Sequence, residues 1–367
     1  MMGADGHNES VSVLVPARNE EENLAACLGS LVRQDGIAYE IIVIDDHSTD
    51  RTAEIASRFH GVRLVKADEL PEGWCGKQHA LECGVRHAGG EWLLFTDADT
   101  VHQPGSLRQA VNEAREHGAD LLSYSPAQEV RTFWELALMP VVFAELARTY
   151  RPGDVCNPES PVAAANGQYL LIRRAAYDRI GGHAAVRNTL LEDVALARNV
   201  KQGGGRLRFR YGGDAVSARM YRTLGAMCEG WTKNLAVLFP RARRLAGLRM
   251  LEFVAIVGFA ASTAVSALRG EPAVAIVAGL GGVVVYAGFL RRVVNAHFGR
   301  AAGILALAGL PIFSLFLLRS AIYYGSGRAI SWRGREYRWD SSHRSAFSSQ
   351  PENFLAGEAG KGARSGS

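Results

Sequence analysis

The sequence predicts an α/β domain followed by a membrane domain. Three observations carry this prediction: apolar β-type runs alternate with helical stretches, carboxylates end several of those runs, and long uncharged apolar stretches follow near the C-terminus. The 367 residues have room for one large domain plus an appendage. The formal net charge is only +4, so nucleic acid is not an expected partner.

The first half of the chain reads as alternating strands and helices. Strands are expected at residues 11–17, 39–46, 62–67, 91–97 and 119–125. Helices are expected at about 21–34, from near 50, at 77–87 and at 104–117. The strands are almost continuous in Val, Ile and Leu, which indicates a parallel sheet covered on both faces. Ligands of such sheets bind at the carboxyl ends of the strands.

The region from about 126 to 240 is less regular. Residues 132–148 form a helical stretch that is apolar nearly all round. It is either a core helix or a helix that lies at a membrane interface beside a lipid substrate. A strand is expected at 167–174, and a helix ended by glycines at 190–204.

Three apolar stretches follow, in which Glu252 is the only charged residue. They cover residues 251–268, 273–290 and 301–318. Each has about the 17–25 residues that a bilayer requires. A soluble domain could bury one such helix, but three in succession favour membrane spans. The chain is therefore expected to be a multi-pass protein of the cell membrane.

The arginines near these stretches predict their orientation. They are clustered at 241–249 and at 291–300, whereas Arg269 alone marks the loop between the first two stretches. Basic loops stay in the cytosol, so the N-terminal domain is expected to be cytoplasmic. Three spans would put the basic segment 332–338 outside, against this rule. The third stretch contains Gly309 and Pro311, so it is either re-entrant or the tail is an exception.

These features divide the chain into four parts. We expect a disordered N-terminus at 1–10, a cytosolic domain at 11–240, a membrane domain at 250–325, and a basic and then disordered tail at 326–367. The five cysteines are scattered and form no C-x-x-C pair. This pattern argues against a disulfide framework and against a zinc site, and it suits a reducing compartment.

The segment LLFTDADT places two carboxylates directly after an apolar strand. Asp97 and Asp99 are one residue apart, so both side chains can face the same side of an extended turn. Carboxylates at the end of a buried strand are costly to desolvate and need a positive partner. In most loops such a pair is simply solvated, but this position favours a site for Mg²⁺ or Mn²⁺ that arrives with a nucleotide sugar. His102 is a weaker candidate ligand, because a loop histidine is more often structural.

Other polar residues end neighbouring strands. Asp45 and Asp46 follow the second strand and are suited to accept from the N–H of a base. The turn PARNE, residues 16–20, adds polar groups beside the same crevice. Lys77 begins a helix, where it suits a phosphate or a base edge. The alternative for Lys77 is an ordinary surface lysine.

Together these motifs resemble those of the family 2 glycosyltransferases with the GT-A fold. The resemblance rests on VLVPARNEEENLAACLGSL, IIVIDDHSTDRTAEIA, WCGKQHALECG, LLFTDADT and LLEDVALARNVKQGG, and covers about residues 10–240. It implies a nucleotide-sugar-binding mixed sheet with flanking helices. PEGWCGK and the C-terminal stretches are similar to the membrane-bound subgroup that glycosylates lipids, such as ceramide glucosyltransferase, hopanoid-associated and carotenoid-acid glycosyltransferases.

The resemblance also implies roles for individual residues. Those around the base and ribose of the donor are Pro16, Ala17, Arg18, Glu20 and either Asp45 or Asp46. Asp97 and Asp99 match the metal and diphosphate pair. Asp193, which follows Glu192, matches the catalytic base of an inverting transfer. Without the resemblance, Glu192 and Asp193 would read as charges stabilised by a helix N-terminus.

One departure from the family bears on the product. Processive polysaccharide synthases carry Q-x-x-R-W after the acidic pair, whereas this chain keeps only Trp231, within CEGWTKN. A single transfer from a nucleotide diphosphate sugar, expected to be UDP-linked, to a lipid or isoprenoid-type acceptor fits better. Trp231 or Lys233 is then expected near the acceptor or the diphosphate. The alternatives are a processive synthase, a non-catalytic membrane scaffold with a decayed sugar-nucleotide fold, and a transporter, for which the short-looped spans leave little room.

Overall fold

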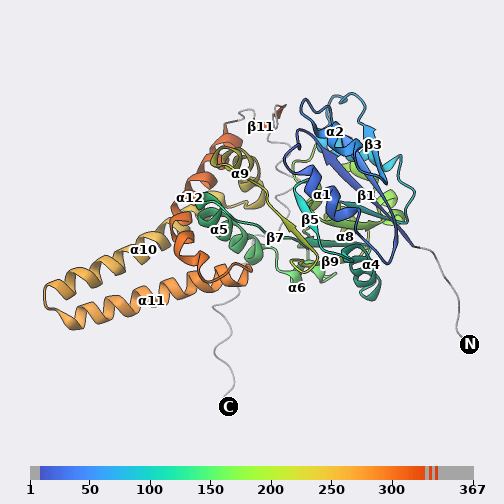
Figure 1. Cartoon of the computed structure of the whole chain (residues 1–367). Helices are drawn as coiled ribbons and strands as arrows, with labels where there is room; N and C mark the ends of the chain where they lie inside the picture. The colour runs from blue at the N-terminus through green and yellow to red at the C-terminus, as the bar shows by residue number, and fades with distance from the viewer. Residues whose placement is uncertain (1–8, 327–329, 333–334, 338–367) are drawn as a thin grey trace, which may run out of the picture.

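A seven-stranded mixed sheet forms the centre of the N-terminal domain (Figure 1). The computed structural model describes residues 9–326, 330–332 and 335–337 of the chain. In spatial order the strands are β3 (Val62–Lys66), β2 (Ala38–Asp45), β1 (Ser10–Ala17), β4 (Trp92–Phe95), β8 (Leu170–Arg173), β6 (Leu121–Ser125) and β9 (Leu207–Tyr211). The predicted α/β class with a mixed sheet and flanking helices is therefore confirmed.

The direction of β8 corrects the expectation of a wholly parallel sheet. Strands β3, β2, β1 and β4 are parallel, and so are β6 and β9. Strand β8 runs antiparallel to both β4 and β6, and pairs Leu170 with Phe95. Because of this reversal, the N-terminal end of β8 lies at the same edge of the sheet as the carboxyl ends of β1 and β4.

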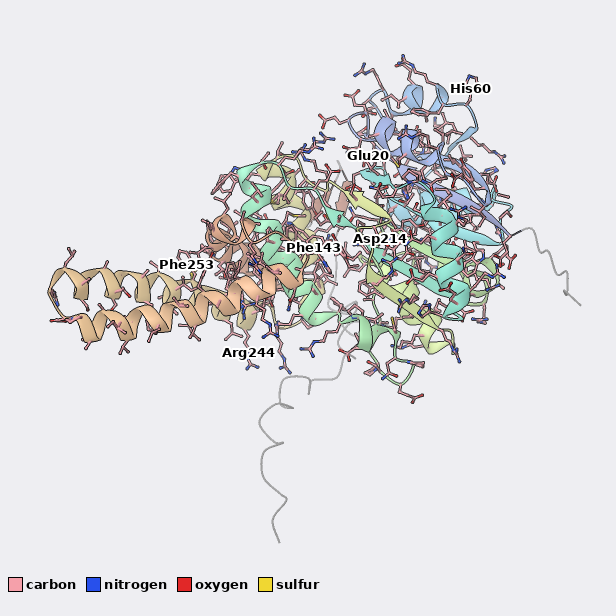
Figure 2. All side chains as sticks on the ribbon, turned by 60° about the horizontal axis from the view of Figure 1, so that its bottom comes forward. Glu20, His60, Phe143, Asp214, Arg244 and Phe253 are labelled. Atoms are coloured by element: carbon pink, nitrogen blue, oxygen red, sulfur yellow. The ribbon has the colours of Figure 1, made fainter. Side chains whose placement is uncertain are left out.

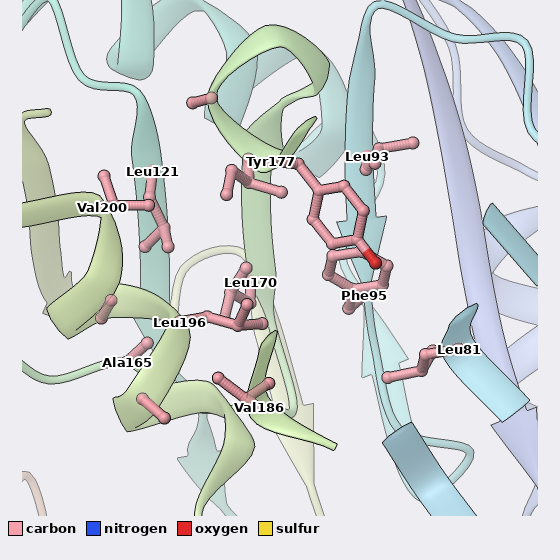
Figure 3. Packing of buried hydrophobic residues seen from close by; sticks show 14 of the residues in the cluster. Leu81, Leu93, Phe95, Leu121, Ala165, Leu170, Tyr177, Val186, Leu196 and Val200 are labelled. Carbon is pink, nitrogen blue, oxygen red and sulfur yellow. The ribbon is translucent and has the colours of Figure 1, made fainter. Parts of the chain in front are cut away.

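Helices cover both faces of this sheet. They are α1 (Leu24–Leu31), α2 (Thr52–Ser57), α3 (Gly76–Val85), α4 (Ser106–Glu116), α7 (Arg174–Arg179), the 3-10 helix η1 (His183–Val186) and α8 (Glu192–Gln202). Side chains along β1 alternate between two cores, because successive residues of a strand point to opposite faces. Val13 packs with α1 and α4, whereas Leu14 packs with α3 and α8. Figure 3 shows the second core, with Leu196 beside Leu170.

A small second sheet, which the sequence did not predict, follows the D-x-D segment, residues 97–99. It is formed by β5 (Thr100–His102), β10 (Val216–Ala218) and β7 (Ala127–Gln128). The backbone N–H of Arg219 donates to the carbonyl of Asp99 at 3.2 Å. This sheet therefore fixes the backbone immediately after Asp97 and ties it to the chain that leads to α9 (Leu224–Leu238).

Helix α5 (Phe133–Thr149) is a core helix over most of its length. Leu138, Val141 and Val142 are at most 2% exposed. They pack among side chains of α9 and of the last long helix, α12 (Ala302–Gly325). At the N-terminus of the helix, the aromatic side chains of Phe133 and Trp134 are exposed. Only this end of the helix therefore still suits a membrane interface.

Three helices near the C-terminus are long and apolar enough to cross a membrane. They are α10 (Ala242–Leu268), α11 (Pro272–Asn295) and α12. Figure 1 shows α10 and α11 as a hairpin that leaves the body of the molecule, whereas α12 lies against α5 and α9. In the apolar windows of α10 and α11 only 11% of residues are buried, against 39% in α12.

The expected disordered ends lie mostly outside the described residues, which exclude 1–8, 327–329, 333–334 and 338–367. Within the tail, β11 (Ile330–Trp332) and β12 (Arg335–Tyr337) pair as antiparallel strands. A short α6 (Pro152–Cys156) follows α5.

Candidate active site

A cavity of about 260 Å³ opens at the carboxyl ends of β1 and β4. Its wall comes from eight separate segments of the chain. The lining residues are Pro16, Ala17, Arg18, Glu20, Asp46, Cys75, Lys77, Gln78, Ala80, Asp97, Ala98, Asp99, Asn166, Gly167, Gln168, Leu190, Leu191, Glu192, Asp193, Met220, Tyr221, Lys233 and Asn234. Most of the predicted site residues therefore meet in one place.

Lys77 is the cation that faces Asp97 in this structure. Its Nζ lies 2.7 Å from Oδ1 of Asp97 and 2.8 Å from Oε1 of Glu192. Burial alone would lower the pKa of Lys77, but the two carboxylates raise it well above its ordinary value. Burial alone would raise the pKa of Glu192, but the positive charge of Lys77 lowers it below its ordinary value. Lys77 is thus a charged link between the D-x-D segment and α8, not an ordinary surface lysine.

Asp193 lies in the same cavity but has different partners. Its Oδ2 accepts from the backbone N–H of Gly167 at 2.8 Å, and its Oδ1 from the N–H of Val194 at 2.8 Å. Burial and the neighbouring charge of Glu192 raise the pKa of Asp193 to about 7. A carboxyl group with a pKa near neutrality, held in a fixed orientation, is suited to take up a proton.

Asp99 lies across the cavity beside an amide. The Nε2 of Gln168 is 3.4 Å from Oδ1 and 3.5 Å from Oδ2 of Asp99. The described residues contain no group of three or more His, Cys, Asp or Glu side chains that could hold a metal by themselves. A divalent cation that arrives with a nucleotide needs only one or two protein carboxylates, because phosphate oxygens supply the other ligands. Asp97 and Asp99 fit that smaller requirement.

His102 faces away from this cavity. It is buried, and its Nε2 lies 3.1 Å from the hydroxyl of Thr96 and 3.2 Å from that of Thr100. Burial lowers the pKa of His102 to about 3, so the ring is neutral at ordinary pH. These contacts favour the structural interpretation of this histidine.

Asp45 and Asp46, at the end of β2, differ in their position relative to the cavity. Asp46 lines the cavity, and the guanidinium of Arg18 donates to its carbonyl oxygen at 2.7 Å. Asp45 is not among the lining residues, and its Oδ1 accepts from the N–H of Ser48 at 3.2 Å. Of the two alternatives, Asp46 is therefore the better placed for a ligand.

The two α9 residues expected on the acceptor side differ in position. Lys233 lines the cavity, and burial lowers its pKa although Glu192 opposes this effect. Trp231 is only 2% exposed and packs edge-on against Tyr221, with ring centroids 5.5 Å apart. Tyr221 itself lines the cavity. Trp231 thus supports the wall from behind.

Sequence reasoning missed the loop of Asn166, Gly167 and Gln168. It precedes β8, and parallel-sheet reasoning places ligands only after strands, not before them. Because β8 is antiparallel, its preceding loop reaches the ligand edge. The backbone N–H of Gly167 then holds Asp193, and a Cβ added at Gly167 would lie 2.9 Å from Nζ of Lys77. A signal was present, since Asn-Gly is a typical turn pair before a strand.

Residues 12–181 match the family model described as Glycosyl transferase family 2. Similar curated proteins include the 4,4'-diaponeurosporenoate glycosyltransferases of Staphylococcus aureus strains USA300 and MRSA252. Each is 29% identical over 238 residues, which is 63% of this chain and 62% of the relative. The match thus spans less than two thirds of the length of these relatives.

Solved structures to which the chain is similar include two that contain Mn²⁺. The mannosyltransferase PcManGT from Pyrobaculum calidifontis, in complex with GDP-Man, is 20% identical. The comparison covers 85% of this chain and 86% of that one, with a TM-score of 0.49. Glucosyl-3-phosphoglycerate synthase from Mycobacterium tuberculosis, with UDP and phosphoglyceric acid, is 21% identical. This comparison covers 62% of this chain and 76% of that one, with a TM-score of 0.42.

Proposed function

We propose that this chain, a transferase that carries a glycosyl transferase family 2 domain, moves a sugar from a nucleotide diphosphate sugar to a membrane lipid. The family predicted from the motifs is confirmed. The proposed reaction is a single, inverting and metal-dependent transfer. One observation carries it: Asp97, Asp99 and Asp193 line the same cavity, in which Lys77 links Asp97 to Glu192.

The donor is assigned to the side of the cavity formed by β1, β2 and β4. Pro16, Ala17, Arg18 and Glu20 line this side together with Asp46, where the base and ribose are expected. Asp97 and Asp99 then face the diphosphate. We assign a UDP-linked sugar as the donor, as the resemblance implies.

Asp97 and Asp99 are the residues that would hold Mg²⁺ or Mn²⁺. When bound, the cation neutralises the diphosphate and so makes it a better leaving group. Lys77 holds Asp97 and Glu192 in place and adds a second positive charge near the diphosphate. This charge balances the buried carboxylates when the cavity contains no donor.

Asp193 is assigned as the general base. It takes the proton from the acceptor hydroxyl while that oxygen attacks the anomeric carbon opposite the diphosphate. The N–H groups of Gly167 and Val194 orient the carboxylate. Its pKa of about 7 matches this role, because a base is most effective when its pKa lies near the working pH. Lys233, on the same wall, is assigned to the acceptor side.

Two observations favour a lipid acceptor. The relatives are named as glycosyltransferases of 4,4'-diaponeurosporenoate, and three apolar helices of this chain suit a membrane location. A processive synthase is less well supported, because Trp231 is buried behind Tyr221 and stands outside a Q-x-x-R-W motif.

The test is transfer of label into lipid. Membranes that contain the full chain are incubated with a panel of radiolabelled nucleotide sugars and Mn²⁺, and the lipid extract is separated by chromatography. We expect one labelled lipid with a single added sugar, whose rate of labelling falls by about 10²–10⁴-fold with the Asp193→Asn variant. Label in a polymer, or no label in lipid with any donor, would contradict the proposal.

A further inference from the structure

The hairpin of α10 and α11 and the helix α12 differ in their surroundings. Side chains along the hairpin, such as Val277, Val284 and Leu268, are 70%, 71% and 89% exposed. Figure 2 shows the hairpin reaching away from the body beyond Phe253, with Arg244 near its base. In α12, by contrast, Phe313 and Leu317 are fully buried.

The loop before α12 and the C-terminal end of α12 both contact the N-terminal domain. In that loop, between α11 and α12, His297 stacks on Tyr211 with ring centroids 3.6 Å apart. Near its end, the hydroxyl of Tyr324 donates to the carbonyl of Lys233 at 2.7 Å, and Ser320 to that of Thr232 at 2.7 Å. A 24-residue helix is about 36 Å long. One folded domain that contacts both the loop before such a helix and the C-terminal end of the helix leaves no room for a bilayer between these contacts.

A close crossing fixes α12 against α5 near its middle. A Cβ added at Gly309 would lie 1.9 Å from the backbone oxygen of Ala137. Only glycine permits this approach, so the backbone of α12 at Gly309 lies directly against the backbone of α5 at Ala137. The buried face of α12 is thereby committed to the protein and not to lipid.

Charges mark the two ends of the hairpin. At its base, the buried Glu145 of α5 lies 3.6 Å from Arg249 of α10 and 4.0 Å from Arg292 of α11, and Glu252 pairs with both arginines. At its tip stand Arg269 and Glu271. Between base and tip, residues 253–268 and 272–290 carry no charge. These are about 24 and 28 Å of helix, close to the hydrocarbon thickness of about 27–30 Å.

We propose that only α10 and α11 cross the bilayer, and that α12 lies along the cytosolic surface of the membrane, on the same side as the N-terminal domain. The exposed apolar side chains of α12, Ile304, Leu315 and Ile322, then contact lipid from that side. Two crossings return the chain to the cytosol. The basic segment 332–338 therefore obeys the orientation rule that three spans would break. The backbone of β11, which lies near α9, is on the same side.

This topology rests on the membrane location assigned under the proposed function. Its test uses single cysteines and a membrane-impermeant maleimide. The background replaces Cys156 and Cys228, since the other three cysteines are buried. The reporters are Glu271→Cys at the tip and Ser326→Cys after α12, and the reference is Ser57→Cys, exposed at the end of α2.

Each variant is labelled in intact cells and in inverted vesicles. We expect Glu271→Cys to react in intact cells, and Ser326→Cys to react, like Ser57→Cys, only in inverted vesicles. Reaction of Ser326→Cys from the side of Glu271→Cys would show three crossings and overturn the proposal. Reaction of Glu271→Cys from the side of Ser57→Cys would show a hairpin that lies on the surface and would also overturn it.

Sugar transfer to lipid is measured in the same vesicles, so that the two proposals fail separately. Transfer with unexpected labelling retains the function and rejects the topology. Expected labelling without transfer by the unsubstituted protein retains the topology and rejects the function.

Discussion

Two clusters of buried charge, one in the cavity and one at the base of the hairpin, are built from similar residues but balanced differently. In the cavity, Lys77 pairs with Asp97 and Glu192, while Asp193 accepts only from backbone N–H groups among its described hydrogen bonds. At the hairpin base, Glu145 lies 3.1 Å from Arg148 and also contacts Arg249 and Arg292.

The difference separates a structural role from a chemical one. Carboxylates enclosed by arginines, like Glu145, are neutralised by the fold and tie helices together. Carboxylates that line a cavity, such as Asp99 and Asp193, can be neutralised by a ligand or by a proton. At Asp193, burial and the neighbouring charge of Glu192 raise the pKa to about 7, so a proton can neutralise this carboxylate near neutral pH.

The largest effect is expected for Asp99→Asn in the cavity. Removing this charge weakens the hold on the cation, which contributes several kcal/mol to the transition state, so transfer should fall about a thousandfold or more. Donor affinity, measured by calorimetry with Mn²⁺, should fall as well. The matched control is Asp178→Asn, an exposed acid in α7. Full transfer by Asp99→Asn in the presence of EDTA would rule out the metal assignment.

Glu145→Gln tests the other cluster. It leaves Arg249 and Arg292 short of negative charge in a buried setting, which should lower the free energy of unfolding by about 3 kcal/mol. Thermal unfolding in detergent measures the loss, with exposed Glu116→Gln as the control. Donor affinity at low temperature should stay unchanged. A stability equal to that of the control would mean that this cluster does not tie the hairpin to the domain.

Gly309→Ala addresses packing instead of charge at the same end of the molecule. The added methyl group would collide with the backbone of Ala137, so α5 and α12 must separate, at about 1–3 kcal/mol. Gly258→Ala in α10, where no atom lies within 4 Å, is the matched control and should be neutral or slightly stabilising. Equal melting temperatures for both variants would contradict the close crossing.

The dependence of transfer on pH should be the smallest effect. Below a pH of about 7 the base becomes protonated, so the rate should fall by up to about tenfold per unit. The stability effect has the opposite sign: the native pKa lies above the ordinary 3.8, so the native state binds more protons and this carboxyl destabilises the fold as pH rises between those values. A rate that stays flat from pH 5 to 8 would contradict the assignment.

Local patterns were sufficient for six of the seven strands of the main sheet and for most of the cavity, but not for β9 or for the small second sheet. An apolar run that ends in acids placed Asp97 and Asp99 correctly at the cavity, because strand ends meet at one edge of a parallel sheet. Long-range pairing was not accessible in the same way. The reversal of β8, the ion pairs of Lys77 and the burial of Trp231 depend on contacts between segments far apart in the sequence.

The central claim, that Asp193 is a base and not a ligand of the donor, is tested most directly by comparing donor affinity with transfer rate. Asp193→Asn should lower kcat by about 10²–10⁴-fold while donor affinity, measured by calorimetry, stays close to that of the unsubstituted protein. The interaction that is lost belongs to the transition state. Transfer to a hydroxyl acceptor at the original rate, or a loss of donor affinity as large as that of Asp99→Asn, would contradict the assignment.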